Sequence, residues 1–77
     1  MIVTVKLMGD LRKYLRGRAE PIRCELPERS VVGNLVRELG IEPEEEIVVG
    51  VNGELGSQAS ELADGDEVLL LTPMAGG

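Results

Sequence analysis

The sequence contains no His, Trp or Phe, and its 77 residues include a single Tyr and a single Cys. Without His, neither a Ser-His-Asp triad nor a Cys-His pair can be built. A His-containing zinc site is excluded for the same reason, and one Cys supplies neither a four-Cys site nor an internal disulfide. We therefore expect no metal site and no nucleophilic triad in this chain.

Features that suit nucleic acids or membranes are also scarce. The net charge is −6, which phosphate backbones and anionic lipids repel. Tyr14 is the one aromatic side chain in the sequence, so the chain offers few side chains on which nucleic-acid bases could stack. No apolar run approaches the ~20 residues that cross a bilayer, and the amino terminus has the pattern of a strand rather than of a signal peptide. We expect a cytoplasmic protein without nucleic-acid or membrane partners.

Basic residues are missing from the second half of the chain. Residues 1–37 hold all eight basic residues and four acidic ones (+4), whereas residues 38–77 hold ten acidic residues and no Lys or Arg (−10). Either the two halves neutralise each other on the surface, or an acidic face accelerates encounter with a basic partner. For the second case we expect the acids nearest the carboxyl terminus to be Glu54, Asp64, Asp66 and Glu67, rather than Glu44–Glu46. Asp66 is also expected to bond nearby backbone amides.

Hydrophobic spacing predicts the elements of the first half. A period of two predicts a strand over residues 2–8 and an antiparallel partner between Pro21 and Pro27. Helical spacing predicts a short helix between them that stops at Gly17. A main helix follows, with Ser30 as its expected cap and with close packing of Gly33 against the sheet. Its apolar face comprises Val32, Leu35, Val36 and Leu39.

The second half continues with three further strands. A compact strand at 47–51 leads into Asn52-Gly53, a type I′ turn signal, and a short return through Glu54-Leu55. Leu62 is expected in the core, and a buried strand at 67–71 ends before Pro73. This order predicts an α+β fold in which a mixed sheet with central first and last strands packs on one main helix, the β-grasp or ubiquitin-like arrangement. We expect a single domain over residues 1–77 with a flexible tail at 73–77.

Few residues are candidates for chemistry. Cys24 lies on the apolar side of its strand, as a small core residue or as a nucleophile without an evident base. Glu44–Glu46 form either a solvated acidic run or a cation site, and the spacing of a calcium loop is absent. Gly76-Gly77 at the carboxyl terminus are either a frayed end or a reactive one. Without Cβ atoms this backbone can enter a narrow site, and residues 73–77 reach about 17 Å when extended.

Three segments resemble a known family: Val51–Glu54, Leu62–Val68 with its Asp-Gly-Asp centre, and Pro73–Gly77. Across essentially the whole chain, the sequence is similar to the sulfur-carrier branch of the ubiquitin-like proteins. The small subunits of molybdopterin synthases have the closest pattern, and Leu7–Arg12 fits their strand-to-helix junction. Thiamine-pathway sulfur carriers are more distant. Leu70-Leu71 and Thr72-Pro73 stand where synthase subunits often have aromatic residues and a Pro-Pro pair.

This resemblance implies a protein that is not catalytic alone and binds no cofactor. A ubiquitin-activating-like adenylyltransferase would use ATP to adenylate the carboxylate of Gly77, and a sulfur nucleophile would then convert it into a thiocarboxylate. The large subunit of a molybdopterin synthase would use that sulfur to build the dithiolene of the molybdenum or tungsten cofactor. Other acceptors (thiazole, tRNA or cysteine) are alternatives. So are a protein modifier joined to lysines through Gly77 and a β-grasp binding module with an inert tail.

The same resemblance, together with strand phase, supplies the site residues. Gly77 is expected to react and Gly76 to act as a steric gate. Met8 is out of phase with the inward residues of its strand, Leu55 lies just past the Asn52-Gly53 turn, and Leu71 shares with Leu69 the face opposite Val68 and Leu70. Met8, Leu55 and Leu71 therefore predict an exposed apolar patch beside the tail, unless a loop of the protein covers it. The expected partner-binding residues are Met8, Leu55, Leu69, Leu71, Pro73, Met74 and Ala75.

Overall fold

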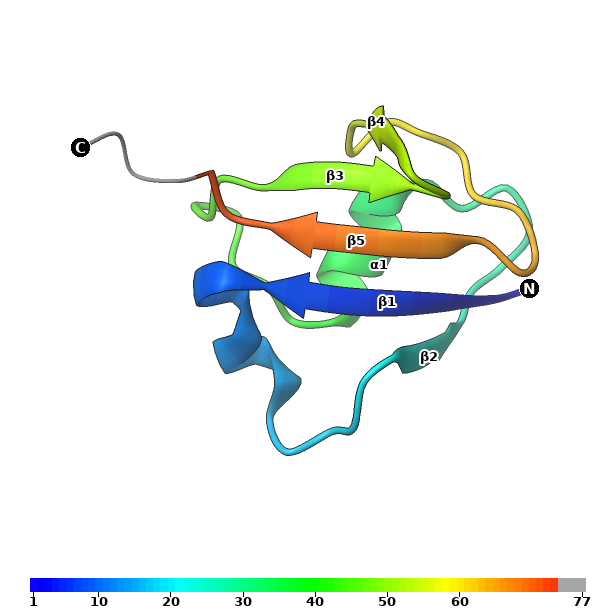
Figure 1. The fold of residues 1–77 in the computed structure, drawn as a ribbon. Coiled ribbons are helices and arrows are strands. Elements are labelled where there is room, and N and C mark those ends of the chain that lie inside the picture. The colour runs from blue at the N-terminus through cyan, green and yellow to red at the C-terminus, as the bar shows by residue number, and fades with distance from the viewer. Residues whose placement is uncertain (74–77) are drawn as a thin grey trace.

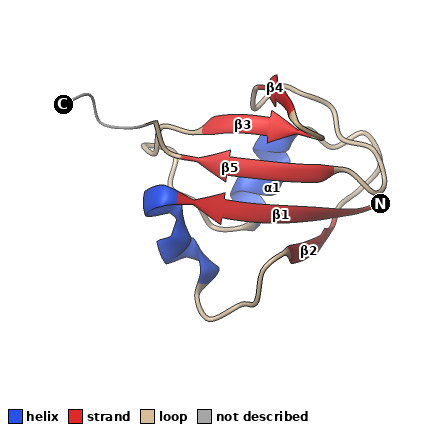
Figure 2. Cartoon of the chain, in the orientation of Figure 1, coloured by secondary structure: helices blue, strands red, loops and turns tan. Residues whose placement is uncertain are grey.

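A computed structural model describes residues 1–73. The strands are β1 (Ile2–Met8), β2 (Ile22–Glu25), β3 (Val48–Val51), β4 (Glu54–Gly56) and β5 (Glu67–Leu71). The helices are the 3₁₀ helix η1 (Gly9–Leu15) and the α-helix α1 (Val32–Glu38). Figure 2 shows the strands gathered in one sheet, with η1 beside the end of β1.

The strands form a mixed sheet in the order β2-β1-β5-β3-β4. β1 and β5 are parallel and lie at the centre, whereas the other neighbouring pairs are antiparallel. The segment between β2 and β3 crosses one face of the sheet, and its helix α1 lies behind β5 and β3 (Figure 1). The predicted β-grasp arrangement, with the first and last strands side by side, is confirmed.

The core lies between α1 and the inner face of the sheet. In β1 the residues Val3, Val5 and Leu7 are fully buried and alternate with more accessible ones, as a strand with one buried face requires. β5 shows the same alternation. Other buried side chains of the sheet, of α1 and of the loops complete the core and include Val32, Leu35, Leu39, Val49, Leu62, Val68 and Leu70. Full burial of each such side chain contributes about 1.5–3 kcal/mol.

The start of α1 differs from the prediction that Ser30 caps it. The Ser30 hydroxyl donates to the Pro27 carbonyl at 2.7 Å and does not cap the helix. Instead, the amides of Val32 and Gly33 donate to the carbonyls of Ser60 (2.9 Å) and Gln58 (2.8 Å). A Cβ on Gly33 would lie 3.3 Å from the Gln58 carbonyl oxygen, so its close packing is against this loop and not against the sheet.

The β3–β4 turn agrees with the prediction. Asn52 and Gly53 both have positive φ, at 51° and 83°, as a type I′ turn requires. The Asn52 amide donates to Asp66 Oδ1 at 2.9 Å, and its oxygen accepts the backbone amide of Glu67 at 2.9 Å. Asp66 also accepts the amide of Ala63 at 2.8 Å, which confirms its local bonding.

Within residues 1–73, no helix has the length and apolar character needed to span a bilayer.

Candidate functional site: the outer face of the sheet and the start of the carboxyl-terminal arm

The predicted site residues fall into two groups. Gly76, Gly77, Met74 and Ala75 lie outside the described residues. Met8, Leu55, Leu69, Leu71 and Pro73 are described, and the structure places them around the end of β5 and on the sheet face opposite α1, here called the outer face.

The outer face carries a row of apolar side chains. Met8 is 48% exposed, Leu69 38% and Leu55 85%, while Leu71 is half-buried. The register pairs Met8 with Leu71, and pairs Gly50 with both Leu69 and Leu55. These four residues therefore lie on one face of β1, β5 and β4, with only Gly50 of β3 between Leu69 and Leu55. The exposure of Met8, Leu55 and Leu69 shows that no loop among the described residues covers this face.

Gly50 lies between Leu69 and Leu55 and leaves a hollow there. An ideal Cβ on Gly50 would be 3.7 Å from Leu69 Cβ, so a larger side chain would fill this space. The hollow is part of an open groove of about 690 Å³, lined by β1, β3, β4 and β5. Contiguous exposed apolar surface of this kind marks an interaction site more often than plain surface.

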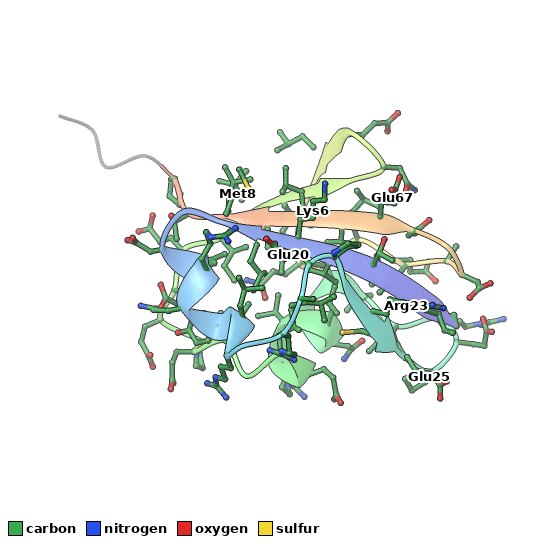
Figure 3. All side chains as sticks on the ribbon, turned by 60° about the horizontal axis from the view of Figure 1, so that its bottom comes forward. Lys6, Met8, Glu20, Arg23, Glu25 and Glu67 are labelled. Carbon is green, nitrogen blue, oxygen red and sulfur yellow. The ribbon has the colours of Figure 1, made fainter. Side chains whose placement is uncertain are left out.

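Charged side chains border the groove. Lys6 and Glu67 line it, and Figure 3 shows both with Met8 along the exposed side of β1 and β5. Glu54 lies on the opposite side of the groove, beside Leu55. The groove thus has an apolar floor with carboxylates and one lysine at its rim.

The acidic residues are not distributed as predicted. Asp64 Oδ1 accepts the amide of Ile2 at 2.7 Å, so the segment that precedes β5 lies beside the amino terminus. The five residues of β5 separate this segment from the start of the arm by about 13 Å. Glu54 also lies away from the arm, because it pairs with Val51, which pairs with Val68 near the beginning of β5. The prediction that Glu54, Asp64, Asp66 and Glu67 lie nearest the arm was therefore wrong. Glu44–Glu46 lie nearer, because β3 follows them and its Val48 pairs with Leu71.

Glu45 is not part of a purely solvated acidic run. It accepts the Tyr14 hydroxyl at 2.7 Å and the Lys13 ammonium at 2.9 Å, and these bonds hold the pKa of the Glu45 carboxyl below its ordinary value. The bond to Glu45 also raises the pKa of Tyr14. Glu44 and Glu46 are exposed, as expected. The spacing of charges along the chain gave no signal for this contact between η1 and the 42–46 loop.

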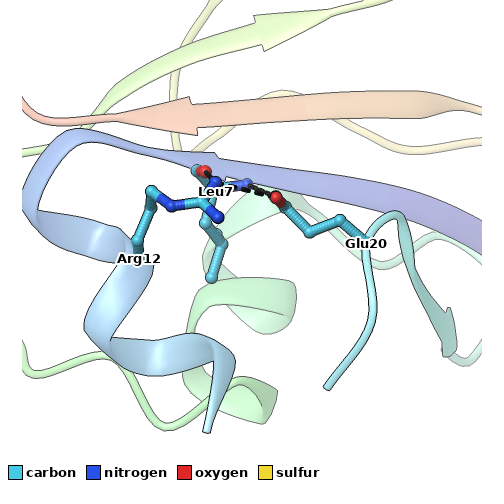
Figure 4. A network of polar contacts seen from close by, with 3 residues as sticks. All are labelled: Leu7, Arg12 and Glu20. Carbon is cyan, nitrogen blue, oxygen red and sulfur yellow. Dashed lines mark hydrogen bonds and ion pairs between the residues drawn. The ribbon is translucent and has the colours of Figure 1, made fainter. Parts of the chain in front are cut away.

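A second polar network, likewise not predicted, closes the edge of β1 beyond the end of β2 (Figure 4). The Leu7 amide donates to Glu20 Oε2 at 2.8 Å, and Arg12 Nη1 donates to Glu20 Oε1 at 2.8 Å. The bond from the Leu7 amide, followed by the Arg12 contact, lowers the pKa of Glu20. Glu20 thus satisfies an amide that β2 is too short to reach.

The remaining chemical candidates are structural. Cys24 is 8% exposed and belongs to the core, and its burial raises the pKa of the thiol. A thiol with a raised pKa forms less of the reactive thiolate. Across residues 1–73, no three His, Cys, Asp or Glu side chains come together in a group that could hold a metal ion.

The strand order, the helix on one face and the uncovered apolar outer face define a ubiquitin-like β-grasp protein. The model of the ThiS family matches residues 5–77, and the chain belongs to the ThiS family. It is thus a ubiquitin-like protein of the sulfur-carrier type. The sequence matches no curated protein closely.

Solved structures extend this comparison. A putative molybdopterin converting factor, subunit 1, from Pyrococcus furiosus is 27% identical, with a TM-score of 0.78 over 96% of this chain and 99% of that one. SAMP1 from Haloferax volcanii is 25% identical, with a TM-score of 0.76 over all of both chains. The thiamine biosynthesis protein ThiS from Geobacter metallireducens is also 25% identical over all of both chains, with a TM-score of 0.64.

Proposed function

We propose that this protein carries sulfur as a thiocarboxylate on Gly77 and donates it to the dithiolene of molybdopterin. The observation that carries the proposal is the ThiS-family match, which extends to the terminal Gly77. The uncovered outer face, which adjoins the start of the arm, gives an enzyme a surface on which to dock.

The proposed chemistry needs no catalytic residue in this chain. The Gly77 carboxylate attacks the α-phosphate of ATP on a ubiquitin-activating-like adenylyltransferase and expels pyrophosphate. Hydrosulfide then attacks the acyl carbon of the adenylate, AMP leaves, and a proton is released. An enzyme persulfide can replace hydrosulfide if a thiol reductant afterwards cleaves the acyl disulfide. Because activation consumes ATP, the proposal agrees with the expected cytoplasmic location.

The proposed acceptor machinery is the large subunit of a molybdopterin synthase. Met8, Leu55, Leu69 and Leu71 would contact it, with Pro73, Met74 and Ala75 entering its site ahead of Gly76 and Gly77. The likeness to a molybdopterin converting factor subunit supports this acceptor. The likeness to ThiS supports a thiazole acceptor as the alternative. The likeness to SAMP1, described in another structure as small archaeal modifier protein 1, supports a protein-modifier role as a further candidate.

The first test is thiocarboxylate formation. The protein is incubated with the adenylyltransferase, ATP and sulfide, and its intact mass is measured for the replacement of one oxygen by sulfur. Deletion of Gly77 and the substitution Gly76→Val should each abolish this mass change while the circular dichroism spectrum stays unchanged. Normal sulfur transfer by the Gly77 deletion would refute the proposal.

The second test distinguishes the acceptors. Thiocarboxylated protein is supplied with a synthase large subunit and the pterin precursor, or with thiazole synthase and its substrates. Formation of the dithiolene supports the proposal, whereas exclusive thiazole formation supports the alternative. Conjugates of higher mass on target lysines would indicate the modifier.

A further inference from the structure

The start of the carboxyl-terminal arm is held against the beginning of η1. The last residue pair between β1 and β5 joins Met8 to Leu71, and Gly9 and Thr72 follow directly. Thr72 Oγ1 accepts the amide of Asp10 at 3.4 Å, a long hydrogen bond between residues 62 positions apart. Thr72 is half-buried, whereas Pro73 is exposed. The side chain of Thr72 is therefore fixed at the point where the chain leaves the sheet.

Gly9 makes room for this hydroxyl. Its φ of +63° is one that residues with a side chain seldom adopt. In addition, an ideal Cβ on Gly9 would lie 2.6 Å from Thr72 Oγ1, closer than such atoms approach each other in real structures. Glycine at position 9 is therefore required for two reasons: the backbone there has positive φ, and a Cβ would collide with the Thr72 hydroxyl.

We infer that Gly9 and Thr72 form a clamp that fixes the direction in which the arm leaves the sheet. Thr72 is then a positioning residue for the activation of Gly77, and this inference rests on the function proposed above. A chain of five residues spans at most about 17 Å, so the direction of its first residue strongly affects which positions its last carboxylate can reach. A fixed origin raises the effective concentration of the carboxylate at the active site once the outer face has docked.

The test compares Thr72→Val with Thr72→Ser in steady-state adenylation, measured as ATP–pyrophosphate exchange with the adenylyltransferase. Val keeps the shape of Thr but lacks the accepting oxygen, whereas Ser retains that oxygen. Docking through the outer face is unaffected, so KM should stay unchanged. We expect kcat to fall about fivefold for Thr72→Val and to recover to within about twofold of the wild type for Thr72→Ser. An unchanged kcat for Thr72→Val, or a change in KM alone, would overturn the inference.

A matched pair of glycine substitutions controls for backbone strain. Gly17 also has positive φ, at +83°, but a Cβ there would meet nothing within 4 Å. Gly9→Ala and Gly17→Ala both introduce a side chain at positive φ, and only Gly9→Ala displaces Thr72. Gly9→Ala should therefore lower kcat, and Gly17→Ala should leave it at the wild-type value. Equal values of kcat for the two variants would contradict the clamp.

The contact itself can be tested without the enzyme. Thr72→Ala removes the atom that a Cβ on Gly9 would meet, so Gly9→Ala should shift the urea midpoint less in the Thr72→Ala background than in the wild type. Additive shifts would show that the contact is absent. If the wild-type protein is not adenylated at all, the proposed function and the positioning role both fail, and this cycle still decides whether the clamp exists.

Discussion

Leu55 shows how a single residue can separate binding from stability. It is the most exposed large apolar side chain among the described residues, at 85%, on a strand of three residues at the edge of the sheet. Leu55→Glu should change the unfolding free energy by less than about 0.5 kcal/mol, because the side chain contacts little of the folded protein. The affinity of the Leu55→Glu protein for the synthase large subunit should fall at least about tenfold, since the substitution places a charge in an apolar interface. Thermal unfolding and titration calorimetry measure the two effects.

A buried leucine on the central strand β5 gives the matched control. Leu70 is fully buried on the opposite side of β5 from Leu69. Leu70→Ala should cost about 2–5 kcal/mol of stability through the cavity that it leaves. If Leu55→Glu instead lowers the melting temperature as much as Leu70→Ala does, Leu55 belongs to the core and the outer face is not a docking surface.

At the scale of elements, the bond between Glu20 and β1 compensates for the short length of β2. β2 pairs with β1 only from Ile2 to Val5. The next β1 amide on the β2 side of the strand is that of Leu7, and it donates to the Glu20 carboxylate. Loss of this bond would leave the edge of β1 open near η1. The connection between η1 and β2 is therefore part of the sheet edge rather than a loose loop.

The pH dependence of Glu20 tests this role. Its folded-state pKa lies below the ordinary value of 4.5, so its contribution to stability is complete above the unfolded pKa and is lost as the pH falls through the folded pKa. Glu20→Gln should lower the urea midpoint at pH 7. The difference in midpoint between the variant and the wild type should shrink as the pH falls below 4.5. Glu25→Gln on β2 is the control, because Glu25 makes no side-chain hydrogen bond or ion pair within residues 1–73. A difference for Glu20→Gln that persists unchanged into acid would contradict the role of its charge.

The elements themselves were largely predictable from the sequence. Alternation identified β1 because one of its faces is buried, and a short apolar run between turn signals identified β5, although the structure exposes one face of that strand. The Asn52-Gly53 pair identified its turn because both positions need positive φ. Ser30 was a wrong cap because its hydroxyl donates to a carbonyl three residues earlier, and the carbonyls of Gln58 and Ser60 accept the first amides of α1 instead. The bond between Tyr14 and Glu45 joins residues 31 positions apart, a distance at which local spacing gives no signal.

For the whole molecule, the uneven charge of the sequence becomes an uneven charge across the sheet. β1 and β2 come from the basic first half of the chain, and β3, β4 and β5 come from the acidic second half. The positions of individual acids could not be inferred from chain order. Asp64, Asp66 and Glu67 are only a few residues from the arm in sequence, but β5, which begins at Glu67, separates them from the arm by its own length. The outer-face residues were predictable, because strand phase separates Met8, Leu69 and Leu71 from the core and the family resemblance points to the same positions.

This distribution predicts how charge guides association. The rate of association with the adenylyltransferase or the synthase large subunit should fall as salt rises, because exposed charges are screened beyond about 8–10 Å at physiological ionic strength. Dissociation should change less. Stopped-flow fluorescence over a salt series measures both rates, and a salt-independent association rate would refute steering.

Two double substitutions locate the steering charges. Glu44→Gln with Glu46→Gln removes two exposed charges near the start of the arm, and Glu28→Gln with Glu61→Gln removes two exposed charges that do not line the groove. The first pair should slow association more than the second. Equal effects would show that net charge matters and position does not.

The parallel pairing of β1 and β5 also has a mechanical consequence. The amino end of β1 and the carboxyl end of β5 lie at opposite ends of the same central pair (Figure 1). A force that pulls these two ends apart therefore loads the hydrogen bonds of the pair in shear, all at once. A force applied between Met1 and Glu25 would instead open the β1–β2 pair one bond at a time, because Ile2 and Glu25 face each other at its end. In single-molecule pulling, the first attachment should give the higher unfolding force, so the domain would stay folded while an enzyme pulls on its arm.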